Sequence, residues 1–288
     1  MSVKKIVASV PGVLALTVAM ASMGSSVAQA SAYAVSTNSI SNFNLGFVGT
    51  TGSLFGFTSS ADTAVQGVSS SNFSNLDAPT ACVGAACSGW GNEFFAHGAS
   101  GDYAFGDAQI SNANVLTGMG AASTIAEISA GAAGFALGTN QLNGFITLTS
   151  SGNVSFSFSA TPFMSATATG GDFSSALMSM SISLYNSMGA QVFNWTPNGS
   201  LADGIVGGFE TLDATNLNTG ITSVNTYSPL ANGSFAAQSG PLAAGTYTIS
   251  IGMSNQVTAV PEADTYAMLL AGLGLVGYTV SRRKRTLN

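Results

Sequence analysis

Apolar and polar side chains alternate most clearly in the second half of this chain. Residues 144–149 (GFITLT) and 154–159 (VSFSFS) place large apolar side chains at every second position, with SSGN between them. A period of two is typical of strands that bury one face. We therefore predict two strands here, and we interpret the short turn between them as the turn of a hairpin.

Three later segments show the same alternation. They are 176–186 (ALMSMSISLYN), 191–195 (QVFNW) and 246–251 (TYTISI), and turn-forming residues precede the second and the third. Short alternating segments separated by turns predict an all-β fold. The segment 31–258 is long enough for one sandwich or two small ones. We expect one β-sandwich body, jelly-roll-like in form.

The first half of the body has a weaker pattern. Residues 43–48 and 54–58 are candidate strands, and 124–137 is either a short Ala-rich helix or two strands, of which we favour the strands. There is no clean repeat period, so neither a propeller nor a solenoid is predicted. The segments 59–75 and 210–240 are rich in Ser, Gly, Ala and Thr, and we expect any disordered linkers there.

Positive charge is confined to the two ends of the chain. Lys4 and Lys5 lie near the start, residues 6–281 contain no Lys or Arg, and the remaining cations are Arg282, Arg283, Lys284 and Arg285. Ten of the twelve acids lie between 31 and 258, so this segment has a formal charge of −10 with its histidine neutral. A body without cations cannot neutralise phosphates, which excludes nucleic-acid binding and disfavours docking on anionic lipid.

Residues 1–30 have the three parts of a secretory signal peptide. Two lysines open the segment, the apolar run 6–23 follows, and small residues end it before Ser31. The A-x-A cleavage site is formed by Ala28 and Ala30. The alternative is a first transmembrane helix that is retained, but a Pro-Gly pair inside the run favours removal. The cut is uncertain by a few residues, because a second A-x-A follows at 32–34.

The two cysteines, Cys82 and Cys87, stand close together in the sequence CVGAAC. An exported chain is oxidised after translocation, so we expect a disulfide, with two free thiols as the alternative. A bridge across so short a loop removes little entropy from the unfolded chain, on the order of 2 kcal/mol. We therefore expect it to hold a loop rather than the fold.

The C-terminal segment has the pattern of a short membrane helix. Residues 265–281 carry no charge and separate Asp264 from the cation cluster. As a helix they would span roughly 26 Å, close to the hydrocarbon thickness of about 30 Å. The four cations then keep this end in the cytoplasm by the positive-inside rule. A buried helix of a soluble domain is the alternative, and four consecutive cations fit it poorly.

From Val260 to Arg285 the chain resembles the PEP-CTERM sorting signal of Gram-negative bacteria. Pro261 and Glu262 match the Pro-Glu pair, and a polar spacer, the run MLLAGLGLVG and the cation cluster follow in the family's order. Ala263 departs from the family, which usually has a second Pro there.

The resemblance implies processing by an exosortase, an integral membrane enzyme of the cysteine-protease type. Pro261 and Glu262 would be recognised, Arg282 to Arg285 would be the stop-transfer cluster, and the segment 259–288 would be the sorting signal. Its helix, 265–281, would hold the chain in the membrane only transiently.

Together with the signal peptide, the resemblance implies export through the Sec translocon. An intermediate inserted in the inner membrane would precede delivery to the cell surface or the extracellular matrix. The family is associated with exopolysaccharide and biofilm production. We therefore expect a non-enzymatic structural or adhesion protein without a cofactor. One alternative is a carbohydrate-binding module that acts on the exopolysaccharide, and a less favoured one is a secreted hydrolase.

The single histidine, His97, is a weak candidate for catalysis or metal binding. With Cys82 and Cys87 it gives C-x4-C-x9-H, which lacks a fourth ligand and the usual zinc spacing. A Ser-His-Asp hydrolase would need this histidine, and no G-x-S-x-G elbow marks a nucleophile. We expect His97 to be a plain loop residue.

Two groups of acids are candidates for Ca²⁺, which takes carboxylate and carbonyl oxygens. Asp102 and Asp107 form one group, and Asp203, Glu210 and Asp213 form the other. Neither group matches the twelve-residue calcium loop, so we interpret these acids as solvated turn residues, with Ca²⁺ as the alternative.

Two tryptophans, Trp90 and Trp195, are candidates for stacking on sugar rings. Tryptophan is also a common core residue of sandwiches. We expect a core position for both, and Trp195 has the better reason because it lies within a strand pattern.

Overall fold

The structure is a computed structural model. It describes residues 32–65, 68–72, 80–84, 94–98, 103–112, 114–130, 134–169, 171–228, 232–260 and 270–276. The predicted signal peptide, with its cleavage site at Ala28, Ala30 and Ser31, lies outside these residues and stays a prediction.

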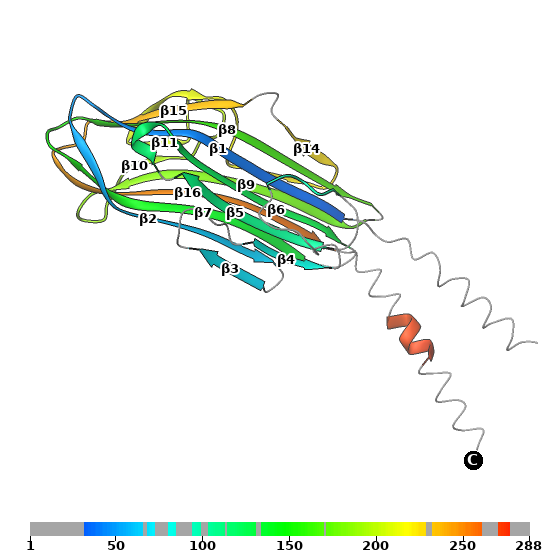
Figure 1. The fold of residues 1–288 in the computed structure, drawn as a ribbon. Helices are drawn as coiled ribbons and strands as arrows, with labels where there is room; N and C mark the ends of the chain where they lie inside the picture. Colours follow the sequence, from blue (N-terminus) through cyan, green and yellow to red (C-terminus); the bar gives the residue numbers. More distant parts are fainter. Residues whose placement is uncertain are drawn as a thin grey trace, which may run out of the picture.

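Two antiparallel sheets pack face to face, which confirms the predicted all-β sandwich (Figure 1). The strands of the first, sheet A, are β1 (Ala32–Val48), β4 (Thr80–Gly84), β5 (Tyr103–Asn112), β6 (Gly120–Ala130), β8 (Asn153–Ala168), β12 (Gly208–Asp213), β14 (Asn225–Tyr227) and β15 (Gly233–Ser239). Their order is β12-β15-β8-β1-β6-β5-β4, and β14 pairs with β8.

The strands of the second, sheet B, are β2 (Gly52–Val65), β3 (Val68–Asn72), β7 (Gly134–Leu148), β9 (Phe173–Tyr185), β10 (Gln191–Trp195), β11 (Ile205–Val206), β13 (Thr219–Thr222) and β16 (Gly245–Val260). Their order is β11-β10-β9-β16-β7-β2-β3, and β13 pairs with β9. A single turn of 3-10 helix, η2 (Val115–Thr117), precedes β6.

β7 and β8 follow one another in the chain but lie in different sheets, so the predicted hairpin is wrong. β7 pairs with β16 and β2, whereas β8 pairs with β1 and β15. The connecting turn is bonded to two distant loops: the Thr149 amide donates to the Thr51 carbonyl, just before β2, and the Gly152 amide to the Leu242 carbonyl, between β15 and β16, each at 3.0 Å. The alternation shows only that each strand buries one face. Two strands in opposite sheets that face each other across the core give the same pattern as two paired strands of a hairpin.

The ambiguous segment 124–137 forms the end of β6 and the start of β7, which confirms the two strands that we favoured. The linker prediction is wrong for the described residues of 59–75 and 210–240. The first of these segments holds the end of β2 and all of β3, and the second holds β13, β14, β15 and most of β12. Sheet pairing depends on backbone groups, so a composition of small residues does not prevent it.

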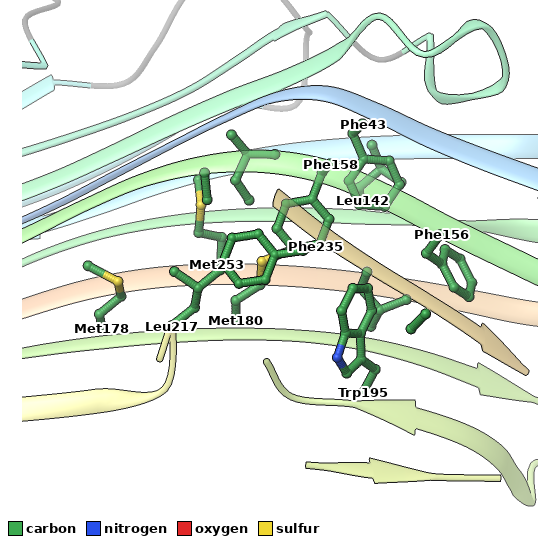
Figure 2. Close-up of a cluster of buried hydrophobic side chains, with 14 of the residues drawn as sticks. Phe43, Leu142, Phe156, Phe158, Met178, Met180, Trp195, Leu217, Phe235 and Met253 are labelled. Atoms are coloured by element: carbon green, nitrogen blue, oxygen red, sulfur yellow. The ribbon is translucent and has the colours of Figure 1, made fainter. Parts of the chain in front are cut away.

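Aromatic side chains fill the space between the sheets toward one end of the sandwich (Figure 2). Phe158 lies at the centre, with ring centroids 4.8 Å from Phe235, 5.5 Å from Trp195 and 5.7 Å from Phe43. Trp195 is fully buried, which confirms its predicted core position. Trp90 lies outside the described residues.

Small and polar residues connect the sheets toward the other end. A Cβ on Gly138 would lie 2.4 Å from the Asp107 carbonyl oxygen, so the two backbones approach closely there. The Ser36 hydroxyl donates to Asn255 Oδ1 at 2.8 Å, and Asn255 Nδ2 donates to the Thr124 carbonyl at 3.0 Å. These buried bonds join β1, β16 and β6, so hydrogen bonds as well as apolar packing hold the two sheets together there.

β1 begins and β16 ends at this same end of the sandwich (Figure 1). Ala32 pairs with Ala168 at the end of β8, and Val260 pairs with Phe173 at the start of β9. The chain therefore leaves the sandwich beside the point where β1 begins.

Candidate functional site

The predicted sorting residues follow directly after the last strand. β16 ends at Val260, and Pro261 and Glu262 lie just outside the described residues. Arg282, Arg283, Lys284 and Arg285 also lie outside them. The structure thus places the start of the sorting segment at the end of a strand that is hydrogen-bonded on both sides, to β7 and to β9.

Residues 270–276 form a helix inside the predicted membrane segment 265–281. Its apolar side chains are exposed: Leu270, Leu273, Leu275 and Val276 have exposed fractions of 56–68%. This exposure does not fit the alternative of a helix buried in a soluble domain. In the part of the chain that the structure describes, no helix has the length and apolar character needed to cross a membrane. The full span of 265–281 stays a prediction.

His97 is bound to a buried carboxylate on the outer face of sheet A. Glu127, in β6, is fully buried, and its Oε2 lies 2.9 Å from Nδ1 of His97, whose side chain is 8% exposed. The carboxylate also accepts the backbone N–H groups of His97, at 2.9 Å, and Gly98, at 3.0 Å. The Tyr33 hydroxyl donates to Oε1 at 2.7 Å. His97 lies in a loop segment, as expected, but its imidazole and its backbone N–H are both held by Glu127.

Aromatic rings enclose this cluster. The imidazole centroid lies 5.0 Å from Phe105 and 6.2 Å from Tyr103, both in edge-on contact. Burial, reinforced by Glu127, raises the pKa of both Tyr33 and Tyr103 above the ordinary range, so both phenols stay protonated. A His-carboxylate pair is a component of some catalytic sites. Here the contacts of the carboxylate hold the segment 94–98 against the sheet.

Sequence reasoning missed Glu127, although a signal was present. Glu127 lies between Ile125 and Ile128 in a segment that we considered for a helix or two strands. It shares the outer face of β6 with Ile125, because side chains two residues apart point the same way. An acid in such a position is rarely buried without partners. What the sequence did not show was which distant backbone would supply them.

Cys82, in β4, is disulfide-bonded and packs beside the same cluster. Its predicted partner Cys87 is the only other cysteine of the chain and lies outside the described residues. The pairing therefore stays a prediction.

The acids that we interpreted as solvated turn residues are only partly so. Asp203 is exposed, but Glu210 is 8% exposed in β12, and Asp107 is fully buried in β5. Asp102 lies outside the described residues. Among the described residues, no group of three or more His, Cys, Asp or Glu is arranged as a metal site, and this includes Asp203, Glu210 and Asp213.

Glu210 and Asp213 come together because a bulge between Glu210 and Leu212 shifts the register of β12. Asp213 Oδ2 accepts three backbone N–H groups, those of residues 198–200, at 2.8–3.3 Å. Burial, followed by the charge of Asp213, raises the pKa of Glu210 to about 7. The indole N–H of Trp195 lowers the pKa of Glu210, although this N–H does not make a hydrogen bond with the carboxyl group.

This pKa predicts a pH dependence of stability. The unfolded chain releases the Glu210 proton near pH 4.5, and the folded chain retains it up to about pH 7. The contribution of Glu210 to the free energy of unfolding is therefore fully present below about pH 4.5 and is lost as the pH rises through about 7. Glu210→Gln removes this dependence. Denaturant unfolding at pH 4, 5.5 and 8 measures it, and equal pH profiles for both proteins would contradict the assignment.

Comparison with known proteins places the C-terminal segment. Residues 259–285 match the family description "PEP-CTERM protein-sorting motif", over the region that the resemblance had covered. No curated protein matches the chain, and no solved structure matches it. The motif implies recognition by an exosortase, export and sorting to the cell surface. The chain therefore carries a PEP-CTERM protein-sorting motif, which begins at the end of the last strand of an all-β sandwich.

Proposed function

We propose that the sandwich is a non-enzymatic structural or adhesion component of the cell surface or extracellular matrix, associated with exopolysaccharide in biofilm. The observation that carries the proposal is the direct connection of the sorting motif to β16. Because β16 lies inside sheet B, the part of the chain that is sorted is the sandwich itself.

The charge distribution supports the same proposal. The body between residues 31 and 258 carries ten acids and no Lys or Arg, so it has little attraction for nucleic acids or anionic lipids. In the proposed route the signal peptide directs the chain to the Sec translocon. The segment 265–281 then holds an inner-membrane intermediate until the exosortase acts.

Sorting is expected to fail when the Pro-Glu pair is replaced. In the double variant Pro261→Ala, Glu262→Ala, we expect the membrane-bound precursor to accumulate and the surface form to fall about tenfold, since 1.4 kcal/mol of lost recognition has that effect. Mass spectrometry and immunoblotting of surface and membrane fractions measure both forms. Asp203→Asn removes an exposed acid outside the motif and is the control. Surface protein that retains Arg282 to Arg285 would contradict processing.

The role of the body is tested in the producing strain. Deletion of the gene should weaken the cohesion of the biofilm and the retention of polysaccharide at the surface, and the intact gene should restore both. The sorting variant should not restore them, although it produces the same sandwich. Unchanged cohesion after deletion, with sorting intact in the parent strain, would contradict the structural role and leave the sorting result standing.

A further inference from the structure

The outer face of sheet B has a polar centre. The pairing register of four strands aligns their polar side chains in rows there. The central row runs across β2, β7, β16 and β9 and consists of Ser60, Gln141, Gly252 and Ser181. The next row toward Val260 consists of Asp62, Thr139, Ser254 and Ser179. The row on the opposite side runs from Thr58 to Ser183 and holds hydroxyl and amide side chains. With strands about 4.8 Å apart and side chains about 6.8 Å apart along each strand, these rows cover about 14 Å in each direction.

This polar centre is hollowed at Gly252, where one strand lacks a side chain. The hollow has a volume of about 320 Å³, and Asp62, Gln141, Ser179 and Ser254 are among its lining residues. A second hollow of about 500 Å³ opens farther from Val260 on the same face, between Phe145 of β7 and Tyr185 of β9. Both hollows cross β16 and lie in line along the strands.

Aromatic rings border the polar centre on the side of the second hollow. Phe55 and Phe145 stack with centroids 5.6 Å apart, and their exposed fractions are 48% and 42%. Tyr185 lies in the same row, because Phe145 pairs with Thr248 and Thr248 with Tyr185. The face therefore combines an aromatic platform with adjoining rows of hydroxyl, amide and carboxylate groups.

The side chains of this face favour some classes of ligand over others. A protein interface usually has an apolar centre and a polar rim, whereas here the centre is polar and the aromatic groups lie at its border. Polyanions are disfavoured, since residues 6–281 supply no Lys or Arg and Asp62 places a carboxylate in the hollow. An uncharged chain of hydroxyl-bearing rings fits: hydroxyls can exchange hydrogen bonds with the Ser, Thr, Asn and Gln side chains, and ring faces can pack on Phe145.

We propose that the outer face of sheet B, along the two hollows from Gly252 to Phe145 and Tyr185, binds a neutral polysaccharide chain. The inference rests on the proposed function and adds to it the binding site and the uncharged class of ligand. The side chains that would line the bound chain are those of Asp62, Gln141, Phe145, Ser179, Tyr185 and Ser254.

Gly252→Val tests the site without disturbing the fold. A Cβ at Gly252 would have as its nearest neighbour Ser181 Oγ at 3.8 Å, an ordinary contact, and valine is favoured in strands. The valine side chain would fill the first hollow. Gln256→Val is the matched control, because Gln256 is exposed on the same face of β16 but does not line either hollow. Phe145→Ala removes the aromatic platform independently.

The experiment is calorimetric titration of the full-length chain in detergent with neutral dextran, neutral galactomannan and anionic alginate. We expect binding of a neutral glycan and none of alginate, with affinity about tenfold lower for Gly252→Val and for Phe145→Ala and unchanged for Gln256→Val. Thermal unfolding confirms that each variant is folded. Binding that survives both Gly252→Val and Phe145→Ala, preference for alginate, or no binding of either neutral glycan would each overturn the site. The biofilm phenotype of the deletion strain does not enter this readout, so each proposal can fail without the other.

Discussion

Removal of the Glu127 carboxylate is expected to lower the free energy of unfolding by about 3–5 kcal/mol. In Glu127→Ala the backbone N–H groups of His97 and Gly98 and the hydroxyl of Tyr33 lose their acceptor, and all of them lie in a buried or partly buried setting. The segment 94–98 should detach from sheet A. Denaturant unfolding measures the stability, and limited proteolysis measures the release of the segment.

Two further variants separate the parts of this cluster. Glu127→Gln keeps the size and one acceptor oxygen, so it should destabilise less than Glu127→Ala. His97→Ala removes the imidazole contact, at 2.9 Å, but keeps the two backbone donors, so its loss should be smaller as well. A Glu127→Ala protein within 1 kcal/mol of the parent, or one in which segment 94–98 stays protected from protease, would show that the carboxylate does not hold the segment.

Phe158→Ala is expected to cost about 3–5 kcal/mol of unfolding free energy, the range for a large aromatic residue removed from a core. Phe158 is 3% exposed and touches three other rings, so its loss leaves a cavity between the sheets and removes stacking with Phe235, Trp195 and Phe43. Figure 2 shows this ring at the centre of the aromatic group. Denaturant unfolding with a fixed m-value measures the change.

Phe145→Ala is the matched control, because it removes the same side chain from the outer face of sheet B. Phe145 is 42% exposed, so we expect a loss of no more than about 1 kcal/mol. Equal losses at both positions would mean that the aromatic group of Figure 2 is not the main core of the sandwich.

The fold class could be predicted from local patterns, but strand partners could not. The alternation in 144–149 and 154–159 correctly predicts two strands with one buried face each. Each strand finds its partners among segments far away in the chain: β7 pairs with β2 and β16, and β8 with β1 and β15. The composition of 59–75 and 210–240 wrongly predicted disordered linkers. Both segments contain strands, because small residues form backbone hydrogen bonds between strands as large ones do.

The candidate sites differ in the same way. The sorting motif is contiguous, so residues 260–285 could be recognised from their order alone, and the comparison finds the motif at 259–285. The cluster of His97, Glu127 and Tyr33 joins residues up to 94 positions apart. The polar centre around Gly252 depends on the register of four strands, and no segment of the sequence contains it.

By itself the sequence determined the features that depend on linear order. These are the position of the cations, the terminal sorting motif and the two-residue period that predicts the strands. The tertiary structure alone decided which strands face each other, which acids are buried and which hydroxyl and amide groups share one surface. The physical reason is that alternation specifies only that a face is buried or exposed. The identity of the neighbour on that face is set by backbone pairing between distant segments.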